Sequence, residues 1–156
     1  MLFVGRNGTR FELTVVGYQF PDPPEEGLDS NWLEIRIDVD TPQGHWSRTD
    51  PILLTDEIES LTCWLEAIAA AQPHEPEISF LEPNLCFELR DESGDNMTLR
   101  VWFELESRPI WAPAKAADAR DLWVDLEVPR RSARRSASEL RHHLQEFPPR
   151  AAVRTD

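Results

Sequence analysis

The sequence predicts an α+β fold that is mainly β, and three observations lead to this prediction. Apolar and polar residues alternate over several short segments, as in strands with one buried face. Two other segments carry apolar residues at helical spacing. The order of these segments shows no strand–helix alternation of the kind that builds a parallel sheet. We therefore expect an antiparallel sheet in a two-layer sandwich or half-barrel, with a central helix at residues 56–72 and a C-terminal helix at residues 136–147.

The expected strands follow from the period-two alternation and from turn residues between them. Asn7-Gly8 is a typical hairpin turn, so residues 2–16 are expected to form a hairpin. A polar loop around Gly94 predicts a second hairpin. Pro42 and Gly44 indicate a turn before a return strand that begins near His45. The remaining alternating segments are residues 33–39, 78–80, 85–90, 97–105 and 122–128.

The central helix is indicated by apolar residues at i, i+3, i+7 and i+10, which share one helical face. Thr55 or Asp56 can cap its first N–H groups, and Pro73 prevents its extension. Ser136 and Glu139 have the spacing of a capping box and predict the start of the C-terminal helix. The apolar face of the central helix consists of Ile58, Leu61, Leu65 and Ile68.

The charge divides the chain into two parts. Residues 1–129 hold 26 acidic and 9 basic side chains, whereas residues 130–156 hold 3 acidic and 7 basic ones. We expect residues 1–129 to form an acidic β-rich domain, and residues 130–156 to add a basic linker and a short helix docked on it. The formal net charge of the whole chain is −13.

This negative charge limits the partners that the chain can bind. An acidic body repels phosphate backbones, which argues against direct nucleic-acid binding. It attracts a basic protein and accelerates the encounter at low salt, although a solvated surface that promotes solubility also explains it. The sequence contains no apolar run long enough to span a membrane as a helix. We expect a cytoplasmic protein with no membrane contact.

Motifs that would indicate an enzyme are not found in the sequence. It has no GxGxxG, GxxxxGK[ST], GxSxG or HExxH pattern, and its four histidines show no metal-ligand spacing. With 29 acidic residues, no particular carboxylate pair can be chosen as catalytic. We expect no cofactor, no metal and no catalytic residue. Cys63 and Cys86 stand among apolar residues and are expected to be reduced, buried thiols.

Tryptophans in the polar phase of two strands are the most informative feature. Trp102 and Trp123 are out of step with the apolar residues of their strands, so adjacent strands would place both on one sheet face. A helix could cover them as a second small core, or they could anchor a protein partner. The same two alternatives, a place in a second core or a contact with a protein partner, apply to Trp32. The candidate partner-binding residues are Asp29, Asn31, Trp32, Trp102, Glu104, Trp123 and Asp125.

Four stretches of the chain resemble the WapI-type bacterial immunity proteins. They are Gly17-Tyr18-Gln19-Phe20-Pro21, Asp29-Ser30-Asn31-Trp32-Leu33, Pro51-Ile52-Leu53-Leu54-Thr55 and Phe80-Leu81-Glu82-Pro83-Asn84-Leu85. The resemblance covers about the first two thirds of the chain, and the tail beyond Pro129 has no counterpart. It implies a small cytosolic protein that neutralises a contact-delivered toxin, the tRNA-cleaving nuclease domain of a wall-associated protein.

Three functions remain open from the sequence. The first is an immunity protein that binds a basic toxin domain through an acidic surface bearing tryptophans. The second is a small-molecule-binding or enzymatic β domain, which requires a deep concave pocket with convergent polar groups. The third is a self-associating module in which Trp102 and Trp123 form a homodimer face.

Overall fold

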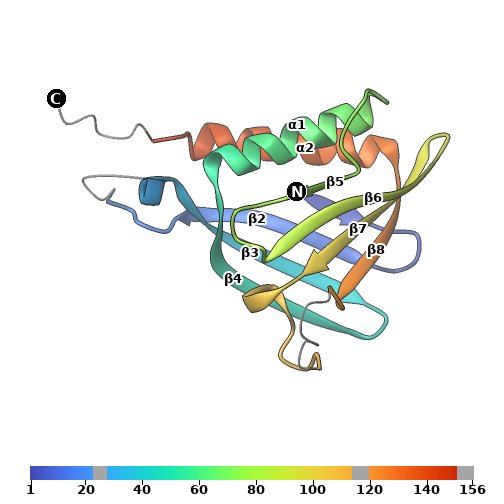
Figure 1. The fold of residues 1–156 in the computed structure, drawn as a ribbon, viewed down its shortest axis with the longest axis horizontal. Coiled ribbons are helices and arrows are strands. Elements are labelled where there is room, and N and C mark those ends of the chain that lie inside the picture. The colour runs from blue at the N-terminus through green and yellow to red at the C-terminus, as the bar shows by residue number, and fades with distance from the viewer. Residues whose placement is uncertain (23–27, 114–119, 151–156) are drawn as a thin grey trace.

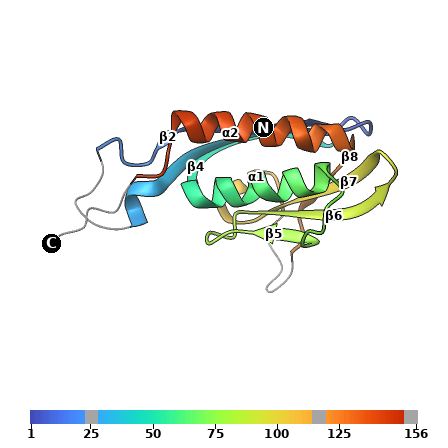
Figure 2. The same cartoon turned by 90° about the horizontal axis from the view of Figure 1, so that it is seen from above.

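The computed structural model describes residues 1–22, 28–113 and 120–150. Two antiparallel four-stranded sheets face each other, and two helices lie side by side along one side of the sheets (Figure 1, top). Figure 2 shows the two helices running beside each other across this side. The described strands do not close into a barrel. The mainly β fold class with antiparallel sheets and two helices is thereby confirmed.

Sheet A is formed by the first four strands in chain order. A hairpin around Gly8, whose φ is +80°, joins the first two strands at the expected turn. The fourth strand begins near His45, as expected, and contains Pro51. An edge strand tolerates this proline because its outer N–H groups have no ladder partner. A short 3-10 helix, η1 (Leu28–Asn31), precedes the third strand. The strands are β1 (Leu2–Val4), β2 (Arg10–Tyr18), β3 (Trp32–Thr41) and β4 (Gly44–Leu54).

Sheet B is formed by the last four strands, also in chain order. The expected second hairpin is present, with Gly94 at its turn at a φ of +58°. A backbone hydrogen bond of 2.9 Å from Arg6 to the carbonyl of Glu127 joins the first turn of sheet A to the edge of sheet B. The 3-10 helix η2 (Leu105–Ser107) follows the third strand of this sheet. The strands are β5 (Glu77–Ser79), β6 (Leu85–Ser93), β7 (Asn96–Phe103) and β8 (Trp123–Pro129).

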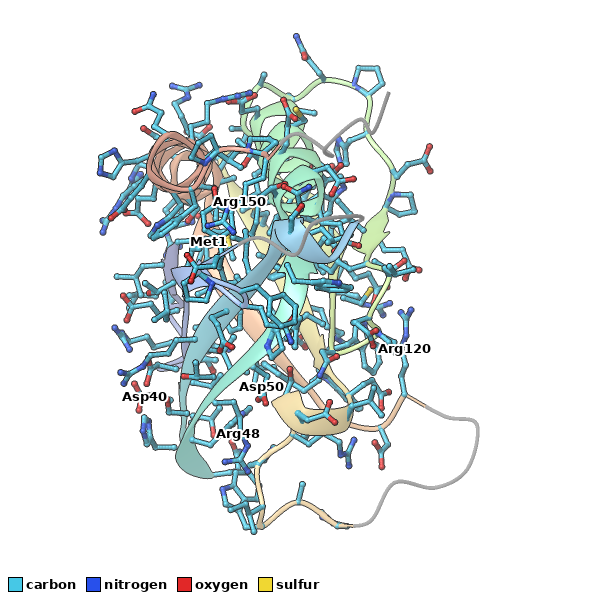
Figure 3. All side chains as sticks on the ribbon, turned by 90° about the vertical axis from the view of Figure 1, so that its left-hand side faces the viewer. Met1, Asp40, Arg48, Asp50, Arg120 and Arg150 are labelled. Atoms are coloured by element: carbon cyan, nitrogen blue, oxygen red, sulfur yellow. The ribbon has the colours of Figure 1, made fainter. Side chains whose placement is uncertain are left out.

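The core lies between the two sheets and under the helices. The ring of Phe11 in sheet A packs edge-on against Phe87 in sheet B, with 5.7 Å between the centroids. Trp46 packs on Phe103 in the same way at 5.1 Å. These contacts join the inner faces of both sheets, as aromatic side chains with large buried areas commonly do. The outer faces of the sheets point in opposite directions, and Figure 3 shows Asp40 and Arg120 on opposite sides of the molecule.

Helix α1 (Thr55–Ala69) ends three residues earlier than predicted. Ala71 follows it with a φ of +51°, which turns the backbone out of the helix before Pro73 is reached. At its start, the carboxylate of Glu57 accepts the backbone N–H of Leu54 at 2.9 Å, whereas Thr55 hydrogen-bonds elsewhere. Cys63 is exposed on this helix, so the expectation of a buried thiol is wrong there; only Cys86 is buried. No helix among the described residues is long and apolar enough to cross a membrane.

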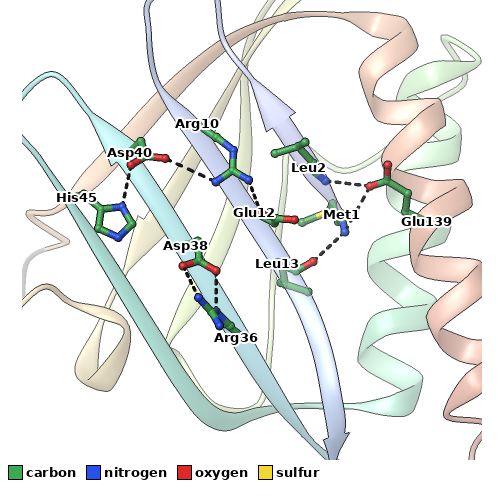
Figure 4. A network of polar contacts seen from close by, with 10 residues as sticks. All are labelled: Met1, Leu2, Arg10, Glu12, Leu13, Arg36, Asp38, Asp40, His45 and Glu139. Carbon is green, nitrogen blue, oxygen red and sulfur yellow. Dashed lines mark hydrogen bonds and ion pairs between the residues drawn. The ribbon is translucent and has the colours of Figure 1, made fainter.

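Helix α2 (Arg130–Glu146) begins six residues earlier than predicted. The residues expected as a basic linker form its first turns, and its apolar face packs against α1 and the core. Ser136 donates to the carbonyl of Leu2 at 3.2 Å. Glu139 accepts the Leu2 N–H at 3.0 Å, as Figure 4 shows. Both polar side chains therefore hold β1 instead of capping the helix. The buried residues of α2 are Ala133, Ser136, Ala137 and Leu140.

Candidate functional site

The outer face of sheet B carries a pair of tryptophans. Strands β7 and β8 are adjacent, and their register places Trp102 directly opposite Trp123. The two ring centroids are 5.1 Å apart, and the rings are tilted by 53°. The same register places Arg100 opposite Asp125. We call the outward surface formed by Glu88, Arg100, Trp102, Trp123 and Asp125 the tryptophan face.

Arg100 is clamped at the centre of this face. Its Nε and Nη2 atoms donate to the two carboxylate oxygens of Asp125 at 2.7 and 2.8 Å. Its guanidinium carbon lies 4.7 Å from the ring centroid of Trp123 and 5.2 Å from that of Trp102. The hydrogen bonds to Asp125 raise the pKa of Arg100, which stays charged. A bidentate ion pair and two cation–π contacts thus fix one arginine in a single orientation.

Glu88 fixes the second tryptophan from the neighbouring strand β6. Its carboxylate accepts the indole N–H of Trp102 at 2.9 Å and also pairs with Arg90 at 2.7 Å. Burial raises the pKa of Glu88, but the hydrogen bonds from Arg90 and Trp102 outweigh this effect and lower it overall. The carboxylate is therefore ionised at neutral pH. The indole of Trp102 is held in place before any partner arrives.

The tryptophan face remains open to solvent. Trp123 is 43% exposed and Trp102 is half-buried, while α1 and α2 pack against each other and the core. The alternative in which a helix covers these tryptophans as a second core is therefore wrong. Aromatic side chains and an arginine, already fixed in position and surrounded by charged groups, form the composition typical of protein–protein binding hot spots.

The other candidate residues lie elsewhere. Glu104 follows β7 at the end of the tryptophan face and is only 7% exposed. Trp32 begins β3 in sheet A, opposite Leu54, and is half-buried. The side chain of Asp29 lies outside the described part of the chain. The structure thus brings together Trp102, Trp123 and Asp125, with Glu104 at one end, and places the residues around Trp32 on the other sheet.

Asn31 is engaged within the protein. Its side-chain oxygen accepts the backbone N–H of Arg150 at 2.7 Å and the hydroxyl of Thr55 at 3.2 Å. Its amide nitrogen donates to the Arg150 carbonyl at 3.1 Å. The guanidinium of Arg150 in turn donates to the carbonyls of Phe20 and Pro21 and lies 3.5 Å from the ring centroid of Tyr18. We call these contacts the C-terminal latch, because they fasten the segment after α2 to the end of sheet A.

Arginines neutralise many carboxylates on both outer faces. On sheet A, Arg36 donates to Asp38, and Asp40 contacts both Arg10 and His45 (Figure 4). The hydrogen bond from Arg36 lowers the pKa of Asp38. Arg100 and Glu88 were not among the candidate partner-binding residues predicted from the sequence, although both stand in the polar phase of their strands, as the tryptophans do. This shared polar phase is the sequence signal that indicates them.

Cavities on the described surface are open grooves of moderate size. One of about 650 Å³ lies at the end of α1 and is lined mainly by polar residues that include His74, Arg90 and Arg130. A smaller one of about 310 Å³ adjoins Trp102. Among the described residues, no three histidine, cysteine, aspartate or glutamate side chains converge in an arrangement suited to a metal ion.

An exposed, prearranged aromatic face on a small two-sheet domain is typical of proteins that act by binding another protein. The family model of the immunity protein WapI-like family matches residues 1–148. The chain belongs to this family of immunity proteins. The match includes β8 and α2, so the expectation that the tail beyond Pro129 has no counterpart is wrong. No curated protein and no solved structure matches the chain.

Proposed function

We propose that this chain protects a cell by binding and neutralising a basic toxin domain through the tryptophan face. The observation that carries the proposal is the uncovered Trp102–Trp123 pair, whose two rings both contact the fixed guanidinium of Arg100. Fixed aromatic anchors lose little conformational entropy when a partner binds, so more of the contact energy appears as affinity. Membership in an immunity protein family supports a toxin as the partner.

The charge of the chain supports a basic toxin. A net charge of −13 attracts a cationic domain over long distances and raises the association rate at low salt. A nuclease that cleaves RNA presents lysine and arginine to the phosphate backbone. We propose that the toxin is such a nuclease, that the acidic protein covers its cationic surface, and that both meet in the cytoplasm. This role requires no catalytic residue in the immunity protein.

We expect a toxin domain to be encoded beside the gene of this protein, and this domain, inactivated at its catalytic site, tests the proposal. Isothermal titration calorimetry is carried out at about 50 mM and about 500 mM salt, because this range changes the screening of exposed charges strongly. We expect binding that weakens steeply at the higher salt concentration. Lack of binding, or binding that ionic strength does not change, contradicts the proposal.

Substitution of the tryptophan pair locates the binding surface. Trp123→Ala removes an exposed ring, so we expect a loss of about 2 kcal/mol of binding free energy, or about 30-fold in Kd, with little effect on stability. Trp111→Ala is the matched control, because Trp111 is 53% exposed but packs against Trp46 of sheet A. Equal effects of the two substitutions would place the interface outside the tryptophan face.

A further inference from the structure

A cavity at the end of the tryptophan face has mostly apolar walls. Its volume is about 310 Å³, at the lower end of the range of about 300–1,000 Å³ for ligand pockets. Phe80 and Pro83 contribute from the connection between β5 and β6, Trp102 from β7, and Leu105 from η2. The rest of the lining consists of Ser79, Leu85, Cys86, Glu104 and Arg120. We call this cavity the Trp102 pocket; it has room for one large side chain.

Leu105 lies at the mouth of this pocket with an exposed side chain and an unfavourable backbone conformation. It is 54% exposed, and its backbone φ is +48°, in the left-handed region that a leucine rarely adopts. Neither solvent exposure nor this backbone conformation favours a leucine at this position. Residues held in such conformations cluster at binding sites, where a partner makes use of the fixed side chain.

Arg120 is also fixed beside the pocket. It pairs with Glu77 at 3.2 Å, and its guanidinium carbon lies 5.9 Å from the ring centroid of Trp102. It donates to the sulfur of Cys86 at 3.4 Å as well. These contacts hold the Arg120 side chain over the buried thiol, at the side of the pocket. The side chain therefore lines the pocket and does not occupy it. Figure 3 shows its side chain at the surface of the molecule.

The mouth of the pocket is negatively charged. Glu82 precedes Pro83, and Glu106 follows Leu105; both glutamates are exposed, and no basic side chain in the described ranges forms an ion pair with them. A hydrogen bond from Asn84 lowers the pKa of Glu106, which keeps it ionised. Burial, and to a smaller extent the charge of Glu106, raise the pKa of Asp50 on β4.

We propose that the Trp102 pocket receives one large apolar side chain of the toxin domain, flanked on the toxin by lysine or arginine. The apolar side chain would contact Trp102 and Leu105, and the flanking cations would face Glu82 and Glu106. This inference rests on the proposed function and specifies the chemistry of the toxin surface. An apolar anchor seated in a pocket with a charged rim is the usual arrangement of an interface hot spot.

Two substitutions with matched controls test the pocket. Ser79→Trp fills it, because Ser79 is an exposed edge residue that lines it. Ser93→Trp is the control at the other end of the sheet, on β6, at another exposed position. Leu105→Gly removes the apolar side chain and relaxes the positive φ, so the fold does not lose stability. Ala71→Gly is its control, because Ala71 also has a positive φ but lies outside the pocket.

Binding of the inactivated neighbouring toxin domain is measured by calorimetry, and the thermal midpoint of each variant is recorded. We expect Ser79→Trp and Leu105→Gly each to raise Kd by about 10-fold or more, a factor that calorimetry resolves well. The controls Ser93→Trp and Ala71→Gly should bind like the wild type. The midpoint of Leu105→Gly should equal or exceed that of the wild type.

The possible outcomes distinguish a failure of the pocket assignment from a failure of the proposed function. If the wild type binds the toxin domain and both pocket variants bind equally well, the pocket assignment is overturned while the proposed function stands. If the wild type does not bind, the proposed function itself fails, and with it the toxin as occupant. Sedimentation of the free protein provides the remaining check: a dimer of the wild type that Ser79→Trp dissociates would assign the pocket to a second copy of the chain and overturn the proposal.

Discussion

Arg130 closes the end of helix α1 by donating from Nη1 to the carbonyl of Ile68 at 2.6 Å. The same nitrogen lies 2.7 Å from Oε1 of Glu92 on β6. Arg130 is also the first residue of α2, and its backbone N–H donates to the carbonyl of Asp95 in the β6–β7 turn. One residue therefore connects the C-terminus of α1, the N-terminus of α2 and one hairpin of sheet B.

Loss of this connection should destabilise the protein. In Arg130→Met the carbonyl of Ile68 keeps only the backbone N–H of Ala71 as a donor, and Glu92 loses its ion-pair partner. We expect the free energy of unfolding to fall by about 1–3 kcal/mol, the usual contribution of a hydrogen bond made by a charged group. Urea denaturation measures the change. Arg131→Met is the control on the exposed side of the helix, and an equally large effect there would contradict the role of Arg130.

The packing of α2 on the core gives a second prediction. Leu140 is fully buried at 0% exposure, so Leu140→Ala should lower the free energy of unfolding by about 2–5 kcal/mol through lost burial and an unfilled cavity. Deletion of residues 130–156 should lower the melting temperature further. Denaturant titration followed by circular dichroism tests both, with exposed His142→Ala as the neutral control. A melting temperature unchanged by the deletion would mean that α2 contributes nothing to stability.

The two thiols should differ strongly in reactivity. Burial raises the pKa of the Cys86 thiol to about 11, despite the nearby Arg120. At pH 8 only about one thiol in a thousand is then ionised, and the thiolate is the reactive form. Cys63 is exposed on α1. We expect a thiol reagent to modify one cysteine in the native protein and the second only after denaturation. Rapid labelling of the native Cys63→Ser variant would contradict this assignment.

His143 should make stability depend on pH in a defined direction. Burial lowers the pKa of its imidazole below the ordinary value of 6.5, and its Nδ1 has no hydrogen-bond partner among the described residues. The unfolded chain therefore binds the proton more readily, so stability falls as the pH decreases through about 6.5. Glu139 and Glu146 oppose the shift without reversing it.

The variant His143→Gln tests this dependence. We expect it to lose less stability than the wild type between about pH 7.5 and pH 5.5, a window above the ordinary titration range of carboxylates. Urea titrations of both proteins across this window measure the difference. His142→Gln is the control, because His142 is the exposed neighbour of His143. The stability of this variant should depend on pH as steeply as that of the wild type. Parallel curves for His143→Gln and the wild type would exclude a contribution from His143.

Local patterns predicted the strands and the central helix well, but they misplaced the start of α2. The Ser136–Glu139 spacing has the form of a capping box, yet both side chains bind Leu2, a residue far away in the sequence. The apolar positions Ala133, Ala137 and Leu140 continue the helical face backwards from this point. The periodicity was therefore the better guide, because a capping motif does not reveal whether a tertiary contact competes for its side chains.

The proposed binding surface was predictable only in part. The polar phase of Trp102 and Trp123 indicated a shared face, and the pairing of β7 with β8 puts the two residues opposite each other. The clamp on Arg100 depends on the register between strands that a long connection separates, and the spacing of residues in the sequence does not determine that register. The use of Asn31 in the C-terminal latch likewise depends on where residue 150 returns to the sheet.

The attachment of the chain's last segment to its first strands has a consequence for synthesis on the ribosome. Leu2 is bound by Ser136 and Glu139, and the carbonyls of Phe20 and Pro21 are bound by Arg150. Translation delivers these partners only after the rest of the domain has emerged, and contacts so distant along the chain are costly to close. The edge of sheet A consequently stays incomplete until residue 150 has emerged from the ribosome, so the native contacts of the first strands form late in the synthesis of this domain.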